Sequence, residues 1–281
     1  MAILYAILSL VSASCNDFLF SRVSRNGIPR GLFILVIGLV SLLAFVFIPW
    51  DAGCSREATW VWGAISGFFS LTANILLIEA MRLEDASLCS TIYRMNLLVV
   101  VLWATLFLGE SLQWQQWLGV CLTIGAILAF MPGGLKSRQG ATISRTGFLL
   151  ALLACLIRGG MGLAYKYGFA AGADRSGILA LTGVAWILGG ALYGLWRDRP
   201  YRRPDGRTLL LSIVSGGLVV GITFFMAAAL QCGQASVVMP IANMSFIGTL
   251  LLNLAAGHEK LTARKTAAAL CGAAAILLLT T

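Results

Sequence analysis

The stretch LFLGESLQWQQWLG, residues 106–119, decides the fold because it places a short polar turn between two long apolar segments. The segments cover residues 86–108 and 113–131, and each is close to the roughly 20 residues that cross a bilayer as an α-helix. A connection as short as Gly109 to Leu112 makes neighbouring helices antiparallel. The stretch therefore predicts a hairpin of two membrane-spanning helices.

The rest of the chain repeats this pattern. Of its 281 residues, 59% are hydrophobic and only 11% are charged, and the mean hydropathy is +0.90. A soluble domain carries about 25% charged residues, so the composition excludes a soluble enzyme, a disordered chain and a disulfide-rich secreted scaffold. It predicts an all-α polytopic membrane protein with ten transmembrane helices. The expected spans are residues 2–21, 31–50, 59–81, 86–108, 113–131, 146–167, 177–196, 208–230, 236–256 and 265–280.

The basic residues are divided unequally between the two sides of such a bundle. Fifteen of the 20 lysines and arginines fall in connections 1–2, 3–4, 5–6, 7–8 and 9–10, whereas the opposite side holds only Arg56 and Arg175. Because lysine and arginine are enriched in cytoplasmic loops, we expect these five connections in the cytoplasm and both termini outside. The net charge of +9 is then a topology signal and does not indicate nucleic-acid binding.

The two halves of the chain match each other at an offset of 149 residues. The matching residues are Ala86-Ser87 and Ala235-Ser236, Met95 and Met244, and Glu110 and Glu259. Each repeat would contain five spans. Because five is an odd number, the second repeat must enter the membrane from the opposite side, which is the inverted-topology arrangement of many secondary transporters.

The chain resembles the drug/metabolite transporter superfamily in its ten-helix, EamA-like form. The resemblance rests on the two-repeat pattern, on residues 106–119 followed by Gly125, and on the echo GHEKLT at residues 257–262. The second copy departs from the family pattern, since residues 265–269 lack its usual aromatic residue and glycine. The resemblance implies two five-helix repeats, residues 1–134 and 145–281, joined by a cytoplasmic linker at residues 135–144.

The same resemblance implies a transporter of small metabolites without a cofactor. It also makes Glu110 and Glu259 structural turn residues. We expect each carboxylate to accept backbone N–H groups at the start of the following helix, where such groups lack helical partners.

Arg94 is the charged side chain that lies deepest in the predicted fourth span. It belongs to TIYRMN, residues 91–96, where it is close to Tyr93 and Asn96. Its repeat counterpart is Asn243, three residues after Pro240, which removes a helical hydrogen bond and predicts a kink. We expect Arg94, Tyr93, Asn96 and Asn243 to contact substrate. For Arg94, pairing with Asp17 or Glu79 is an equal alternative.

Arg158 lies near the middle of the sixth span, beside three glycines in RGGMG, residues 158–162. In the family that the chain resembles, the first helix of each repeat lines a central cavity. We therefore expect Arg158 to join Arg94 in binding an anion, because a guanidinium group binds carboxylate or phosphate through two hydrogen bonds.

Four further polar residues of the spans are candidates for the transport path. Asp17 and Glu79 are expected to form a gating ion pair or to carry a coupled proton, and Asn16 and Asn74 to contact substrate. Close helix packing within the monomer is expected where glycines are four residues apart. These glycine pairs are Gly63 and Gly67, Gly190 and Gly194, and Gly217 and Gly221.

The sequence offers little for catalysis or metal binding. Its only histidine is His258, its seven cysteines are scattered without a C-x-x-C motif, and it has no H-E-x-x-H, G-x-S-x-G or P-loop motif. We therefore expect no enzyme activity, no metal and no cofactor.

The combined features predict a secondary transporter in a bacterial inner membrane. Its cargo is expected to be a small polar or anionic metabolite, either amino-acid-like or bearing a carboxylate or phosphate, moved by alternating access in export or exchange. A flippase for a lipid-linked headgroup on the same fold is the alternative. The expected partners are the substrate and the lipid bilayer. Coupling to a proton or a counter-substrate, and a monomeric or homodimeric state, are left open.

Overall fold

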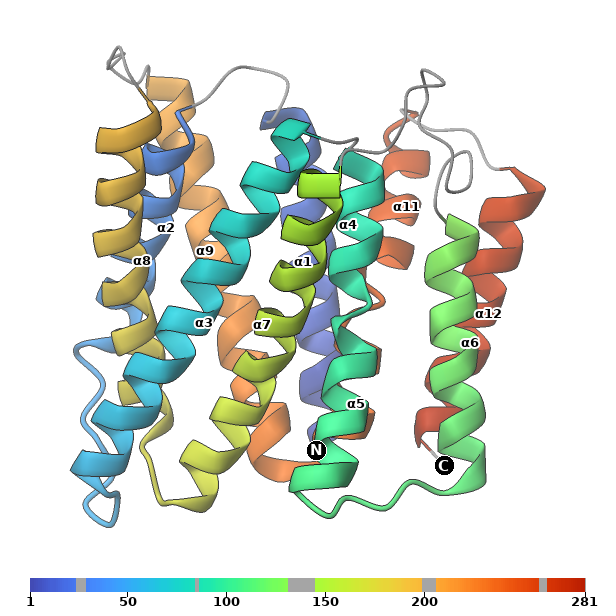
Figure 1. Cartoon of the computed structure of the whole chain (residues 1–281), viewed down its shortest axis with the longest axis horizontal. Helices are drawn as coiled ribbons and strands as arrows, with labels where there is room; N and C mark the ends of the chain where they lie inside the picture. Colours follow the sequence, from blue (N-terminus) through green and yellow to red (C-terminus); the bar gives the residue numbers. More distant parts are fainter. Residues whose placement is uncertain (24–28, 84–85, 131–144, 199–205, 258–261, 281) are drawn as a thin grey trace.

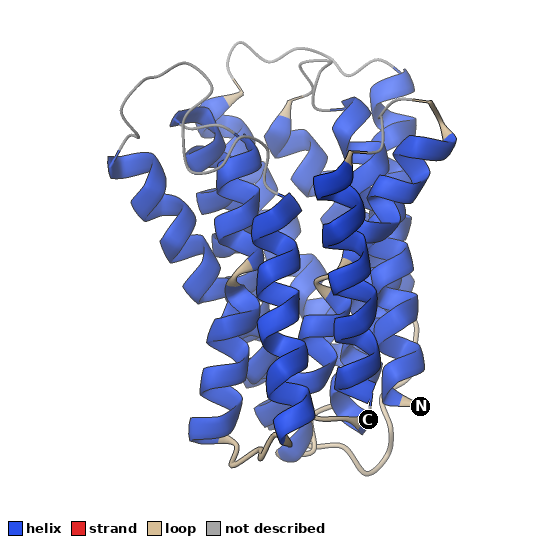
Figure 2. Cartoon of the chain, turned by 90° about the vertical axis from the view of Figure 1, so that its right-hand side faces the viewer, coloured by secondary structure: helices blue, strands red, loops and turns tan. Residues whose placement is uncertain are grey.

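The structure is a computed structural model that describes residues 1–23, 29–83, 86–130, 145–198, 206–257 and 262–280. Within these ranges the secondary structure is helical throughout (Figure 2). The helices are α1 (Ala2–Val23), α2 (Arg30–Phe45), α3 (Arg56–Leu83), α4 (Ala86–Arg94), α5 (Asn96–Phe107), α6 (Trp114–Phe130), α7 (Arg145–Ala170), α8 (Arg175–Arg197), α9 (Gly206–Cys232), α10 (Ala235–Ala242), α11 (Ser245–Ala255) and α12 (Ala263–Thr280).

The apolar helices lie where the sequence predicts membrane spans. Six of them are long and apolar enough to cross a bilayer, and α10 and α11 count together as one of these. Shorter apolar helices occupy the expected second, fourth, fifth and tenth positions. The polytopic, all-helical fold class is thus confirmed, although α2 ends at Phe45 and not near residue 50. Pro49 accounts for this early end, because the residue before a proline avoids helical backbone angles.

The helices run side by side, with both termini at one end of the bundle (Figure 1). The helix ends that flank the five basic connections all lie at the opposite end. Below, these are called the basic end and the terminal end. Residues 135–144, expected as a linker, lie outside the described residues, as does Glu259.

Helix packing follows the pairing that a two-fold repeat requires. With α1 to α6 equivalent to α7 to α12, the contact of α3 with α7 corresponds to that of α9 with α1. The contact of α3 with α8 likewise corresponds to that of α9 with α2, and α5 with α7 to α11 with α1. The pairs α2 with α8 and α6 with α12 each join equivalent helices. The inverted repeat stays a prediction, and this pairing supports it.

Glycines allow α2 and α8 to pack with their backbones almost in contact. A Cβ atom added at Gly183 would lie 2.8 Å from the backbone nitrogen of Leu42, and one at Gly38 would lie 2.6 Å from that of Ile187. Neither site has room for a side chain, so these glycines set the distance between the two helices.

Candidate functional site

Two membrane spans are interrupted at positions that the sequence repeat makes equivalent. The fourth span breaks at Met95, between α4 and α5, and the ninth breaks at Asn243 and Met244, between α10 and α11. Figure 2 shows such breaks as short tan segments inside the bundle. Interrupted helices within a membrane are tolerated where they are buried in protein or line a cavity, and many transporters bind their cargo there.

Side-chain amides accompany both interruptions. The amide nitrogen of Asn96 donates to the carbonyl of Tyr93 at 2.7 Å, and that of Asn243 donates to the carbonyl of Met239 at 2.9 Å. Such bonds offer the backbone an alternative to regular helical hydrogen bonds. Pro240 lies inside α10, two residues before that helix ends. The equivalent residue of α4 is Thr91, so a proline alone does not explain the two breaks.

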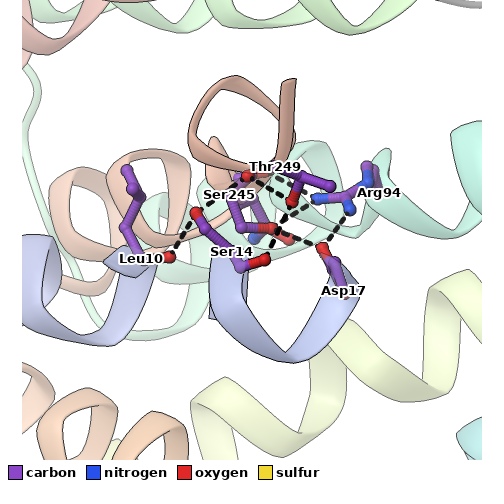
Figure 3. A network of polar contacts seen from close by, with 7 residues as sticks. Leu10, Ser14, Asp17, Arg94, Ser245 and Thr249 are labelled. Carbon is purple, nitrogen blue, oxygen red and sulfur yellow. Dashed lines mark hydrogen bonds and ion pairs between the residues drawn. The ribbon is translucent and has the colours of Figure 1, made fainter. Parts of the chain in front are cut away.

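Arg94 connects the two interruptions with the first span (Figure 3). Its guanidinium group donates to the carboxylate of Asp17 at 2.8 Å and to the backbone carbonyl of Asn243 at 3.1 Å. It also donates to the hydroxyl of Ser245 at 2.9 Å, and that hydroxyl in turn donates to Asp17 at 3.0 Å. Of the two alternative acid partners for Arg94, the structure thus selects Asp17.

Further polar contacts fasten α1 and α5 to the ninth span around this ion pair. The hydroxyl of Ser14 donates to the carbonyl of Ser245 at 2.9 Å, and that of Thr249 donates to the carbonyl of Ser14 at 3.3 Å (Figure 3). The amide of Asn243 donates to Asn96 at 3.3 Å. The cluster of Asp17, Arg94, Asn96, Asn243 and Ser245 is called the Arg94 cluster below.

Glu79 belongs to a different cluster, toward the basic end of the bundle. Its carboxylate accepts from the hydroxyl of Tyr193 at 2.7 Å and pairs with Arg197 at 3.0 Å and with Arg82 at 3.4 Å. The contacts with Tyr193 and Arg197 join α3 to α8, whereas Arg82 belongs to α3 itself. The alternative pairing of Arg94 with Glu79 is therefore wrong for this conformation, because Glu79 has partners of its own on neighbouring helices.

Arg158 stands apart from the Arg94 cluster. Its guanidinium group donates to the sulfur of Met161 at 3.2 Å, and it has no other hydrogen bond to a described residue. Among the described residues it forms no ion pair. The following glycine packs tightly, since a Cβ atom at Gly159 would lie 2.6 Å from Val99 of α5. The glycines beside Arg158 thus allow close helix approach, as expected.

Glu110 caps a helix, but not the helix that the sequence suggested. We expected it to accept from the start of the following helix, α6. It accepts instead from the backbone nitrogens of Ala235 and Ser236, each at 2.9 Å, and from the hydroxyl of Ser236 at 2.6 Å. Lys166 lies 3.6 Å from the same carboxylate. Glu110 therefore caps α10 in the second half of the chain, because the fold brings the start of α10 next to the end of α5.

Asn16 and Asn74 do not reach the Arg94 cluster through any described hydrogen bond. Asn16 accepts from the hydroxyl of Ser215 at 2.6 Å and so joins α1 to α9. Asn74 donates to the carbonyl of Ser70, one turn earlier in its own helix, at 2.8 Å.

A small polar cavity lies between α2, α3, α8 and α9. Its volume is about 20 Å³ for the centres of water-sized molecules, which suits one water but no metabolite. Trp186 donates to Ser70 at 3.0 Å on its wall. The lining residues are Ser41, Ser70, Leu179, Thr182, Gly183, Trp186, Val219 and Thr223.

The sequence reasoning missed the hydroxyl groups that complete these sites. Ser14, Ser245 and Ser236 each contact a residue more than 100 positions away. One signal was available: Ser236 belongs to the Ala-Ser pair that the repeat had already singled out. Ser14 and Ser245 carry no comparable signal, because serines inside apolar helices are common and usually bond to their own helix.

Comparisons with known proteins agree with this architecture. A solved crystal structure superposes with a TM-score of 0.77 at 17% identity, covering 99% of this chain and 96% of that one, which shows a shared fold. A protein of Sinorhizobium sp., named an uncharacterized transporter in the cobO 3′ region, is 32% identical over 71 residues. That match spans 25% of this chain and about half the length of the relative, 50%.

The family model described as the EamA-like transporter family matches residues 1–131 and 145–281, which is nearly the whole chain. An all-helical bundle with long apolar helices is the architecture that a polytopic membrane transporter requires. The chain therefore belongs to the EamA-like transporter family of membrane proteins.

Proposed function

We propose that this chain is a secondary transporter that moves a small polar or anionic metabolite by alternating access, as an exporter or an exchanger. The observation that carries the proposal is the Arg94 cluster, in which a charged side chain of one interrupted span bonds to the backbone at the other interruption. Freed backbone groups and an arginine at such a point can replace the water shell of an anionic cargo.

Two separate sets of contacts support alternating access. The ion pair of Asp17 and Arg94 joins α1 to α4 on the side of the basic end. Glu110 joins the end of the fourth span to the start of α10 at the terminal end. The ion pair itself lies within the first repeat, residues 1–134, but each set also reaches the second repeat, residues 145–281. Arg94 donates to the carbonyl of Asn243, and Glu110 accepts from the start of α10. Opening one set while the other stays closed would expose the centre of the bundle to one side of the membrane at a time.

The binding roles follow from this geometry. Arg94, Asn96 and Asn243 contact the cargo at the interruptions, and Tyr93 and Arg158 extend the site toward α7. Asp17 pairs with Arg94 when no cargo is bound. A carboxylate or phosphate of the cargo then takes the place of Asp17. Protonation of Asp17 would release Arg94 in the same way, so Asp17 is also the residue through which a proton would couple to transport.

The remaining candidates have supporting roles. Glu79 gates the basic end through its ion pair with Arg197 of α8 and the hydrogen bond that it accepts from Tyr193. Asn16 and Asn74 lie beside the path and reach cargo only after the helices move. The basic end faces the cytoplasm of a bacterial cell, with both termini outside, because the excess of lysine and arginine is on that side.

Transport by purified protein in proteoliposomes tests the proposal. A screen of amino acids, carboxylates and phosphorylated sugars should reveal a cargo, and Arg94→Gln should reduce its transport at least about tenfold because a charge-assisted bond contributes roughly 1.5–3 kcal/mol. Arg207→Gln is the matched control, since Arg207 is exposed at the start of α9 and outside the site. The proposal would be contradicted if the screen found no transported compound, or if Arg94→Gln kept full activity.

A further inference from the structure

One positive charge inside the bundle has no described negative partner. The other charged side chains of the described helix interiors are accounted for by ion pairs. These pairs are Arg94 with Asp17 at 2.8 Å, Lys166 with Glu110 at 3.6 Å, and Glu79 with Arg197 at 3.0 Å and with Arg82 at 3.4 Å. Arg158, near the middle of α7, is outside all of them. An isolated charge at this depth is costly and marks a functional site by default.

The immediate neighbours of Arg158 do not compensate its charge. Its hydrogen bond to the sulfur of Met161, at 3.2 Å, uses a weak and neutral acceptor. Among the described residues it has no second hydrogen bond, and the tyrosine hydroxyls within its electrostatic range, those of Tyr93 and Tyr165, are neutral. The guanidinium group therefore keeps donors available for an oxygen-rich ligand.

Tyr165 adds a second unsatisfied donor at the same place. Its side chain is fully buried, with 0% exposed, and its hydroxyl has no hydrogen bond of good geometry to any described residue. The hydroxyl of Thr182 is nearby but not placed for a hydrogen bond to Tyr165, and it donates to the carbonyl of Ile178 at 3.0 Å. Tyr165 follows Arg158 by seven residues, so the two side chains share one face of α7. A buried hydroxyl without a partner is rare in folded proteins and calls for a ligand.

Resting on the proposed transport function, we propose that the cargo is a small organic monoanion, a monocarboxylate without an ammonium group. Its carboxylate accepts from the guanidinium group of Arg158 and from the hydroxyl of Tyr165, and it takes the place of Asp17 at Arg94 in a separate step of transport. The net charge of the ligand and the protein groups is then zero. Arg94, Arg158 and Asp17 together carry one positive charge, and the carboxylate balances it.

Other charge classes leave this set unbalanced. A dicarboxylate or a phosphate dianion would bring one negative charge too many into the bundle. A zwitterionic amino acid would satisfy Arg158 but add an ammonium group, and the described carboxylates inside the bundle, Asp17, Glu79 and Glu110, already have cationic partners. Either excess would be a charge in a low-dielectric environment without a counter-charge.

A series of four-carbon probes isolates charge from size. At neutral pH we would measure transport of butyrate, succinate, 4-aminobutyrate and butyramide into proteoliposomes, together with their effect on the melting temperature. Butyrate should be preferred. Arg158→Gln should weaken butyrate about tenfold to a hundredfold and butyramide much less, because the neutral amide loses a hydrogen bond but no attraction between opposite charges. Transport of butyrate by Arg158→Lys should be intermediate between that of the unaltered protein and that of Arg158→Gln. Arg207→Gln should behave like the unaltered protein.

A measurement without cargo keeps the proposal testable if a variant is inactive. Arg158→Gln should raise the melting temperature, because it removes an uncompensated charge, whereas Arg94→Gln should lower it by leaving Asp17 unpaired. A lower melting temperature for both would overturn the proposal.

The outcomes also separate this proposal from the one on which it rests. Preference for succinate or 4-aminobutyrate, with Arg158→Gln fully active, would overturn the monoanion assignment and leave the transport function standing. Absence of transport for all four probes contradicts the monoanion assignment. The transport function fails only if the wider metabolite screen is empty as well.

Discussion

At the scale of single residues, Glu110 connects parts of the chain that are distant in sequence. Its side chain is only 9% exposed and holds two backbone N–H groups, one hydroxyl and a lysine. The first backbone N–H groups of a helix have no partner within it, and a carboxylate there also interacts favourably with the helix dipole. A residue at the end of the fourth span thus determines where the ninth span begins.

We expect Glu110→Ala to destabilise the protein by about 2 kcal/mol or more, because it leaves the start of α10 without an acceptor and Lys166 without a counter-charge. Glu110→Gln should cost less, since its amide oxygen can still accept. Chemical denaturation in detergent micelles measures both. Glu57→Ala is the control, because Glu57 is exposed in the first turn of α3. Equal effects of Glu110→Ala and Glu57→Ala would show that the contact contributes little.

The pairing of Asp17 with Arg94 can be measured by a double-mutant cycle. The side chains are 36% and 23% exposed, so solvent screens part of their attraction. We expect a coupling energy of about 1–2 kcal/mol between Arg94→Gln and Asp17→Asn in thermal unfolding. The double variant should therefore be more stable than the sum of the single changes predicts. Additive losses would mean that the two side chains do not depend on each other.

Residue chemistry explains which parts of the site were predictable. Arg94 and Asp17 stood out in the sequence because a charge is rare in an apolar segment. Glu110 stood out because the internal repeat pairs it with Glu259. The partner of Arg94 was narrowed to two acids and could not be decided, since depth along a helix does not give the direction of a side chain. The donors to Glu110 were predicted correctly as backbone N–H groups at the start of a helix but on the wrong helix, because a turn residue can reach a helix that is distant in sequence.

At the scale of helices, the interruptions and the glycine contacts determine how the bundle fits together. The interruptions place polar groups at the centre of two spans. Each interruption is stabilised by a hydrogen bond from an asparagine side-chain amide to a nearby carbonyl. The glycines of α2 and α8 instead remove side chains where the two backbones meet. Of the three glycine pairs predicted to mediate packing, that of α3 packs against α8, and Gly190 packs against α2.

The packing prediction for the third glycine pair, Gly217 and Gly221, was only partly right. Gly217 provides a matched control. Gly217 of α9 has no atom within 4 Å of an added Cβ, whereas Gly183 would meet the backbone of α2 at 2.8 Å. We expect Gly183→Leu to destabilise the protein by about 3 kcal/mol, because backbone atoms cannot move aside. Gly217→Leu should be neutral or stabilising by up to about 1 kcal/mol, since leucine favours helices over glycine. Thermal unfolding of the two variants tests this, and equal melting temperatures would contradict the packing.

At the scale of the whole molecule, the hydropathy and the distribution of basic residues predicted the architecture well. Both depend on sums over many residues, so a wrong assignment of a single position changes little. The predicted helices occur at the expected places, and the helix ends beside the five basic connections gather at one end (Figure 1). The interruption of the fourth span was not predictable in the same way, because it depends on a few local hydrogen bonds around Met95.

The orientation of the bundle leads to a prediction for the intact cell. Cys54 lies in the connection from α2 to α3 at the terminal end, and Arg207 is exposed at the start of α9 at the basic end. If the basic end faces the cytoplasm, a charged maleimide that cannot cross the membrane should label Cys54 on whole cells. In a variant that combines Arg207→Cys with Cys54→Ser and Cys232→Ser, labelling should appear only after the membrane is permeabilised. If the cysteine introduced at position 207 were labelled on whole cells and Cys54 only after permeabilisation, the basic end would face outside. Labelling of both positions on whole cells would place them on the same side and contradict an odd number of crossings between them.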